Sequence, residues 1–279
     1  MTDHSEQPSG MSQDTTTRRI DALVFIHGFL DCGETWAPLL RALPTSSTRT
    51  VAIDLAGAGR RRLEAGPFTL ERATQDVLGL IQREGFATVG LVGHSMGAQV
   101  AELVAWNLME RVAGMLLLTP APLEGNVLSD DVRRLLRESG GDPEAQRQIR
   151  ALFSRNLADA DLDRAVAAER LMGKDTVRSY YDAFTTGDPR GTEKIRYAGP
   201  TMLVGGGGDP VIPTQTIRDI RSARFPLARL EVVQDAGHWP QLEQTQAMAE
   251  LVASMFPQHR HPRLETGERP VYSVGHPES

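Results

Sequence analysis

Short apolar runs alternate with longer amphipathic segments along most of this chain. The short runs contain few polar positions, which is typical of strands that are covered on both faces of a parallel sheet. The alternation predicts an α/β fold with a mostly parallel central sheet and helices on both faces. The predicted strands are Ala22–Ile26, Thr50–Ile53, Val89–Val92, Met115–Leu118, Thr201–Val204 and Arg229–Val233, and the predicted helices are Thr35–Ala42, Leu70–Glu84, Ala98–Met109, Pro213–Arg221 and Gln244–Met255.

One long segment, residues 123–194, breaks this alternation. It contains no predicted strand and is rich in Arg, Asp, Glu and Ala. We predict that it forms a helical lid, inserted into an α/β core of residues 20–122 and 195–257, over the carboxyl edge of the sheet. An extra packing layer far from any site is the alternative. The predicted helices of this segment are Asp130–Ser139, Pro143–Asn156, Asp161–Met172 and Asp175–Phe184.

The two ends of the chain hold little that could be buried. Residues 1–19 are rich in Ser, Thr, Gln and Asp, and residues 258–279 carry several prolines and scattered charges, so both are predicted to be disordered tails. The histidines of the second tail are not expected to form a metal site, because prolines interrupt their spacing. They are His259, His261 and His276.

Composition excludes several classes of function. The net charge is −6 and the pI is near 5.7, so no nucleic-acid partner is expected. The single cysteine, Cys32, excludes an intrachain disulfide and a cysteine-based zinc cluster. No apolar run is long enough for a membrane span and the first residues lack a secretory signal, so we expect a cytoplasmic protein that does not insert into a membrane. The sequence does not indicate an oligomeric state.

The motif Gly93-His94-Ser95-Met96-Gly97 carries the strongest chemical signal. It lies between a predicted strand and a predicted helix. A serine in such a tight strand-to-helix turn presents its hydroxyl clear of the backbone, and the turn accepts only small residues on either side. We therefore predict that Ser95 is a nucleophile.

A serine nucleophile needs a histidine base and a group that orients the base. His238 follows the last predicted strand and is our candidate, because the carboxyl ends of parallel strands share one edge. His94 should point away from the serine, and His27 should have a structural role beneath the loop that follows the first strand. For the orienting acid we choose Asp209, which follows four glycines after a strand; the rival acids are Asp235 and Glu124.

The reaction also needs two donors for the oxyanion that forms on the attacked carbonyl. The backbone N–H that follows the nucleophile, that of Met96, is the first. The loop after the first strand, His27-Gly28-Phe29, offers the N–H of Phe29 as the second.

These motifs together resemble the α/β-hydrolase superfamily over roughly residues 22–256. The resemblance implies a Ser95–Asp209–His238 triad, an eight-stranded sheet and no cofactor. Two antiparallel strands that usually come first in the family are not evident in residues 1–19, so we expect a shortened sheet edge. The motifs are His27-Gly28-Phe29, Asp54-Leu55-Ala56-Gly57-Ala58-Gly59, Gly93-His94-Ser95-Met96-Gly97, Gly208-Asp209-Pro210-Val211-Ile212-Pro213 and Ala236-Gly237-His238.

The leading functional hypothesis is a serine hydrolase that cleaves a small or medium carboxylic ester, lactone or thioester. The alternatives are a cofactor-free C–C hydrolase or lyase with the same triad, and a non-enzymatic ligand-binding protein of this fold. The segment from His27 to Trp36 is similar to the C–C-cleaving and lyase branches, but Met96-Gly97-Ala98-Gln99 lacks the arginine those lyases carry after the nucleophile. The candidate substrate-binding residues are Trp36, Phe153, Tyr180, Tyr181, Phe184 and Trp239.

Overall fold

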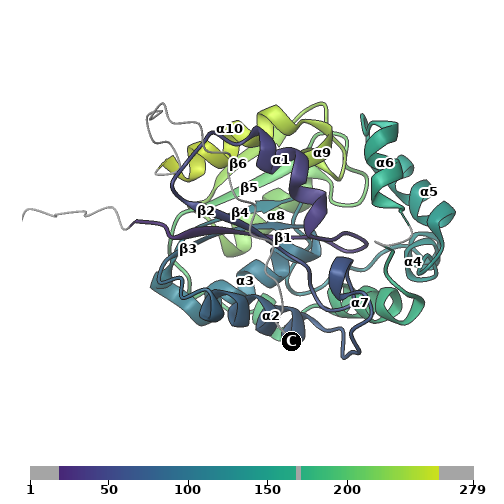
Figure 1. The fold of residues 1–279 in the computed structure, drawn as a ribbon, viewed down its shortest axis with the longest axis horizontal. Coiled ribbons are helices and arrows are strands. Elements are labelled where there is room, and N and C mark those ends of the chain that lie inside the picture. The colour runs from purple at the N-terminus through teal and green to yellow at the C-terminus, as the bar shows by residue number, and fades with distance from the viewer. Residues whose placement is uncertain (1–18, 168–170, 258–279) are drawn as a thin grey trace, which may run out of the picture.

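The protein's computed structural model describes residues 19–167 and 171–257. Within these residues the chain forms one sheet of six strands, all parallel, in the order β2-β1-β3-β4-β5-β6 (Figure 1). The strands are β1 (Ala22–Ile26), β2 (Arg49–Ile53), β3 (Val89–His94), β4 (Val112–Leu118), β5 (Thr201–Gly206) and β6 (Arg229–Val233).

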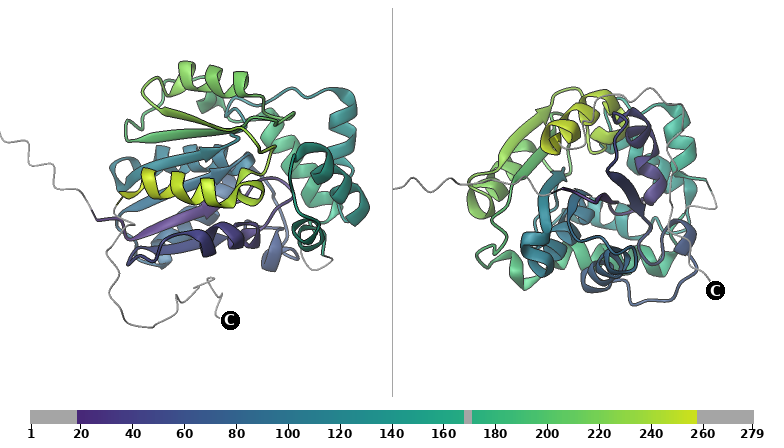
Figure 2. Two further views of the ribbon diagram at one scale, coloured as in Figure 1. Left: turned by 90° about the horizontal axis from the view of Figure 1, so that it is seen from above. Right: turned by 60° about the vertical axis from the view of Figure 1, so that its left-hand side comes forward.

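Helices cover both faces of this sheet (Figures 1 and 2). One face carries α1 (Ala37–Ala42) and α10 (Thr245–Met255). The other carries α2 (Leu70–Arg83), α3 (Met96–Leu108) and α8 (Thr214–Arg224). The remaining helices are α4 (Asp130–Arg137), α5 (Pro143–Phe153), α6 (Asp159–Ala165), α7 (Lys174–Thr186) and the single turn α9 (Pro240–Glu243).

Alternate residues of the central strands supply the two halves of the core. In β1, Val24 and Ile26 belong to the cluster under α2 and α3, while Leu23 and Phe25 belong to the cluster under α1 and α10. All five residues of this strand are buried. Burial on both faces accounts for the continuous apolar pattern of the strand, because successive side chains of a strand point to opposite sides of the sheet.

The predicted fold class is confirmed, and each predicted strand is present. The described residues form six strands, whereas eight are usual in the family that the sequence resembles. Residues 1–18, in which the two additional strands are not evident, lie outside the described residues. The predicted tail at residues 258–279 also lies outside. The last predicted helix, Gln244–Met255, is present as α10, and Gln244, with a φ of −135° and a ψ of 54°, separates it from the short α9.

The inserted segment, residues 123–194, forms α4 to α7, drawn in teal to one side of the sheet (Figures 1 and 2). Its third helix is shorter than predicted, since α6 ends at Ala165. Two of its side chains bond the loops that leave the sheet: Arg150 donates to the carbonyl of Leu30, and Tyr180 to that of Ala56. Among the described residues, no helix combines the length and apolar character that a membrane span requires.

The strand register brings four loops to one edge of the sheet. Ile26 at the end of β1 pairs with Gly93 of β3, and His94 pairs with Leu118 of β4. Gly206 at the end of β5 pairs with Val233 of β6. The loops that begin at these residues carry the predicted oxyanion donors, nucleophile, acid and base, so the parallel topology gathers them at one place.

Candidate active site

Ser95 lies at a strained turn between β3 and α3. Its φ of +52° and ψ of −117° fall where non-glycine residues are rare. The turn is also crowded: a Cβ on Gly97 would collide with the carbonyl oxygens of Ile26 and His27, and a Cβ on Gly93 would collide with the carbonyl of Gly97. The small residues around the serine therefore allow the turn to pack against β1, and this packing keeps Ser95 in its strained backbone conformation at the sheet edge.

Hydrogen bonds join the three predicted triad residues through the imidazole of His238. His238 Nδ1 is 2.8 Å from Asp209 Oδ2, and its Nε2 is 3.1 Å from Ser95 Oγ. All three side chains belong to buried residues. Since the carboxylate can only accept, Nδ1 carries the proton, which leaves Nε2 free to accept the proton of the serine hydroxyl.

The carboxylate of Asp209 is itself held in place by its own loop. Its Oδ1 accepts the backbone N–H groups of Val211 and Ile212 at 2.8 and 3.0 Å. Oδ2 is thereby directed at the imidazole. The rival acids, Asp235 and Glu124, are both exposed.

Negative charge around His238 favours the protonated form of its ring. Burial of the ring opposes that form, but the charge of Asp209 and its hydrogen bond to Nδ1 outweigh burial, with smaller contributions from Asp31 and Glu243. The pKa of His238 is therefore raised above its ordinary value of 6.5. A histidine with a raised pKa accepts the serine proton more readily. It also needs a higher pH to be in the neutral form that can accept this proton.

The loop after β1 is fixed beside the nucleophile by His27. Its Nδ1 donates to the carbonyl of Gly28 at 2.9 Å, and its Nε2 accepts the N–H of Leu55 at 3.1 Å. Burial lowers the pKa of His27, consistent with a neutral ring that donates on one side and accepts on the other. The ring therefore ties the loop that carries Phe29 to the loop after β2, as the structural role predicted for it requires.

Met96 is the first residue of α3. The first N–H groups of a helix have no acceptor within the helix, so they are available to a developing negative charge. In the loop after β1, Leu30 has a φ of +63°, which turns the chain directly after Phe29. Phe29 and Met96 stay our candidate oxyanion donors.

A buried ion pair beneath the site was not predicted from the sequence. Arg150 of α5 donates to Asp31 Oδ1 at 3.2 Å, and the side chains of both residues are 1% exposed. Asp31 Oδ2 accepts the indole N–H of Trp239 at 3.0 Å and lies 3.4 Å from the Nδ1 of His94. Burial alone would raise the pKa of Asp31, but His94, Arg150 and Trp239 together lower it.

A weak signal for this pair is present in the sequence. Arg150 falls on the stripe of α5 that faces inward, one turn after Gln146 and next to Ile149. A charged residue on an apolar stripe suggests a buried partner. Neither the stripe nor its spacing identifies that partner as Asp31, which is more than a hundred residues away in the sequence.

Three aromatic rings form a cluster beside the predicted oxyanion loop. The Phe29 ring is 6.3 Å from that of Tyr181 and 5.2 Å from that of Phe184, measured between centroids. The Tyr181 and Phe184 rings are 5.3 Å apart. Of the six candidate substrate-binding residues, Tyr181 and Phe184 are therefore placed against the loop that carries the candidate oxyanion donor Phe29.

Two other candidates for substrate binding pack in the interior. Trp36 is fully buried in the core and meets Phe25 edge to face, with 5.3 Å between the ring centroids. Tyr180 is also fully buried, and its hydroxyl donates to the carbonyl of Ala56. Both residues are therefore held by contacts within the protein.

The last two candidates, Phe153 and Trp239, are buried beside the base. The backbone N–H of His238 donates to the carbonyl oxygen of Phe153 at 2.9 Å. Trp239 follows His238 in the chain, and its ring centroid lies 5.1 Å from that of the imidazole. Both residues contact His238, and the indole N–H of Trp239 is already committed to Asp31.

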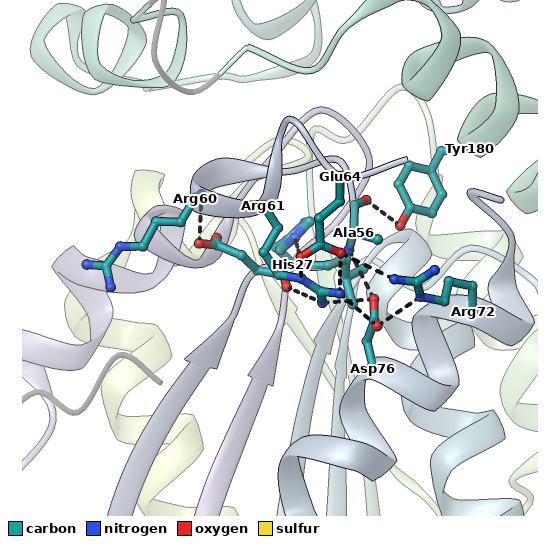
Figure 3. Close-up of polar contacts among 10 residues, drawn as sticks. His27, Ala56, Arg60, Arg61, Glu64, Arg72, Asp76 and Tyr180 are labelled. Atoms are coloured by element: carbon teal, nitrogen blue, oxygen red, sulfur yellow. Dashed lines mark hydrogen bonds and ion pairs between the residues drawn. The ribbon is translucent and has the colours of Figure 1, made fainter. Parts of the chain in front are cut away.

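Within the basic run Arg60-Arg61-Arg62, the side chain of Arg61 is bonded to its surroundings (Figure 3). Arg61 donates to Glu64, to Asp76 and to the carbonyl of Asp54. The side chain of Arg60 extends away from this network (Figure 3). Arg61 therefore serves the structure of this loop rather than an anionic substrate.

The fold and the site together define a class of protein: a parallel α/β sheet with a nucleophile turn, a histidine and a carboxylate at its carboxyl edge. A sequence model of the alpha/beta hydrolase family matches residues 23–251, so the chain belongs to the alpha/beta hydrolase family. The expected enzyme class, an α/β-hydrolase, is thereby confirmed.

Several curated proteins are similar in sequence. The chain is 24% identical over 256 residues to the mouse sn-1-specific diacylglycerol lipase ABHD11, a match that covers 85% of this chain and 81% of that protein. It is 28% identical over 134 residues to the protein PHYLLO of Arabidopsis thaliana and 26% identical over 245 residues to an acetyltransferase component of the acetoin cleaving system of Pseudomonas putida. These two matches cover 45% and 85% of this chain but span only 8% and 64% of the relatives' own lengths.

Solved structures share the fold. An esterase from Exiguobacterium antarcticum superposes with a TM-score of 0.74 at 19% identity and covers 84% of this chain and 91% of that one. A 2-hydroxy-6-oxo-6-phenylhexa-2,4-dienoate hydrolase from Rhodococcus superposes with a TM-score of 0.69 at 20% identity and covers 85% and 91%. At these identities the likeness establishes the architecture and leaves the reaction open.

Proposed function

We propose that this protein hydrolyses a small or medium carboxylic ester, lactone or thioester through an acyl intermediate on Ser95. The observation that carries the proposal is the continuous hydrogen-bonded line from Asp209 through His238 to Ser95. The esterase and lipase relatives support it.

The geometry suggests the order of proton transfers. Ser95 Oγ attacks the substrate carbonyl while His238 Nε2 takes its proton, and the N–H groups of Phe29 and Met96 stabilise the oxyanion. His238 then gives the proton to the leaving oxygen or sulfur, and the acyl group remains on Ser95. In the second half of the reaction, His238 Nε2 takes a proton from a water molecule, whose oxygen attacks the acyl carbon. The proton then passes to Ser95 Oγ as the acyl–oxygen bond breaks, which releases the acid and restores the serine.

The inserted helices act in this proposal as a lid that shapes the acyl pocket. Tyr181 and Phe184 of α7, together with Phe29, form a cluster of largely apolar rings next to the candidate oxyanion loop. An apolar surface favours an uncharged acyl group, because burying a charge without a partner is costly.

The position of Gln99 favours an ester over the substrates of the lyase branch. Gln99 is fully buried, and its amide nitrogen donates to the carbonyls of Pro122 and Phe184 at 2.6 and 3.0 Å. This residue therefore holds the inserted segment to α3, and it supplies no positive charge to a substrate carboxylate.

The test combines an active-site probe with an ester panel. A fluorophosphonate should label Ser95, and p-nitrophenyl esters of increasing acyl length should be turned over. Ser95→Ala should abolish both while its melting temperature stays close to wild type, and Ser222→Ala, at an exposed serine of α8, should change neither. Labelling without turnover of any ester, lactone or thioester would favour C–C bond cleavage, and no labelling would favour a ligand-binding role.

A further inference from the structure

The loop that carries the base is docked on the end of the inserted helix α5. The backbone N–H of His238 donates to the carbonyl of Phe153, the last residue of α5, at 2.9 Å. The residue before it, Gly237, has no room for a side chain, because a Cβ there would lie 2.5 Å from the Phe153 oxygen and 2.8 Å from the Cα of Ser154. The two backbones therefore meet in direct contact.

One carboxylate joins these two backbones. Oε2 of Glu243 accepts the N–H groups of Gly237 at 2.9 Å, of Arg155 at 2.6 Å and of Asn156 at 3.0 Å. Its Oε1 accepts the N–H of Trp239 at 3.0 Å. Glu243 is 9% exposed. Its acceptor oxygens thus bind the residues on either side of the base and the first two residues beyond Ser154.

Of the four bonds to Glu243, only the one from Trp239 is the contact that a single helical turn would make by itself. Trp239 precedes α9, so its contact with Glu243 at the end of that turn is local. Arg155 and Asn156 lie 88 and 87 residues away in the sequence and belong to another part of the fold. Their convergence on one buried carboxylate fixes the inserted segment against the base loop.

We propose that Glu243 is a positioning residue for the base, holding the His238 loop against the inserted segment so that the imidazole lies between Asp209 and Ser95. The proposal rests on the proposed function, because it assigns the base to His238.

The strand before the His238 loop and the other contacts of this loop explain why it needs Glu243 as an anchor. β6, which leads into the loop, is an edge strand and is only partly buried. The carbonyl of His238 is held from the core, by His94 Nε2 at 2.8 Å and by the hydroxyl of Thr119 at 3.2 Å. The backbone N–H groups of the same loop donate to Phe153 and Glu243. The position of the imidazole therefore depends on contacts with the core and on contacts with Phe153 and Glu243.

The charge of Glu243 also reaches the base. The charged or titratable groups that face His238 are Asp209 from the loop after β5, Asp31 from the loop after β1, His94 from β3 and Glu243 from α9. Three of them are acids that favour the protonated ring. Loss of the Glu243 charge should therefore lower the pKa of His238, an effect that a purely structural anchor would not produce.

The experiment compares Glu243→Gln with Glu250→Gln, which removes an equal charge from the exposed surface of α10. On the best ester of the panel, Glu243→Gln should lower kcat by about 10- to 100-fold with little change in KM, as expected for a misplaced catalytic group. The acid limb of its pH profile should move to lower pH. Glu250→Gln should match wild type. A Glu243→Gln profile that overlays wild type in both kcat and the acid limb would overturn the proposal.

Two further measurements separate this proposal from the proposed function. The rate of fluorophosphonate labelling and the downfield proton resonance of the His238–Asp209 hydrogen bond need no ester substrate, and both should change in Glu243→Gln even if wild type hydrolyses no ester. If Glu243→Gln does not fold, Glu243→Asp keeps the charge but shortens the reach. Glu243→Asp should react more slowly with the fluorophosphonate, while the acid limb of its pH profile stays where it is in wild type. Labelling at the wild-type rate would refute the positioning role of Glu243.

Discussion

The substitution Asp209→Asn tests the catalytic geometry most sharply, because the surroundings dictate how the new side chain must lie. Oδ1 of Asp209 faces the N–H donors of Val211 and Ile212, and only an oxygen can occupy that place. The amide NH2 of asparagine must then face His238 Nδ1. The imidazole becomes an acceptor at Nδ1 and carries its proton on Nε2, where it can no longer accept the serine proton.

The expected loss is large. A wrong tautomer in a serine protease triad lowers kcat by about 10⁴. A factor of that size corresponds to about 5.5 kcal/mol of activation free energy. KM should change little, because Asp209 is buried behind the histidine and does not face the substrate.

The assay is steady-state turnover of the best ester of the panel, with the rate of fluorophosphonate labelling as a second readout. Asp235→Asn is the matched control, since Asp235 is the rival acid, lies three residues before His238 and is exposed. The control should stay within about twofold of wild type, as is usual for a surface substitution away from the reacting groups. The assigned geometry is refuted if Asp209→Asn keeps more than about a tenth of the wild-type kcat, or if Asp235→Asn loses as much.

Two further predictions concern pH and stability. The acid limb of kcat/KM should lie above pH 6.5, because the raised pKa of His238 keeps the base protonated, and therefore inactive, to a higher pH; a limb below that value would contradict the assigned charges. Arg224→Met should lower the free energy of unfolding by about 3–5 kcal/mol in urea denaturation, because it leaves the buried Glu102 without its partner. Adding Glu102→Gln to that variant should recover part of the loss, and two variants of equal stability would show that the ion pair is not the cause.

Much of the fold follows from local pattern. The continuous apolar run Ala22–Ile26 indicates a strand buried on both faces, and the structure places it inside the sheet, between β2 and β3. Ser95, Asp209 and His238 could be selected because each follows a strand, and a parallel sheet aligns the carboxyl ends of its strands. The position of each residue after a predicted strand, together with the parallel sheet, was therefore enough to predict that the three lie together.

The supports of the site could not be predicted in the same way. Glu243 and Arg150 act through contacts with backbone groups and side chains that are remote in the sequence. The pattern of a helix states which face is buried, but it does not state what that face meets. Trp36 shows the same limit, since its place beside the catalytic loops in sequence did not indicate that its ring packs in the core.

The buried pair between Asp31 and Arg150 has a consequence for engineering this enzyme. Residues 123–194 cannot be exchanged for the corresponding insertion of a relative as an independent cassette, because the recipient core would keep an acid that has lost its cation. A viable chimera has to transplant the arginine together with the new helices, or neutralise Asp31 at the same time.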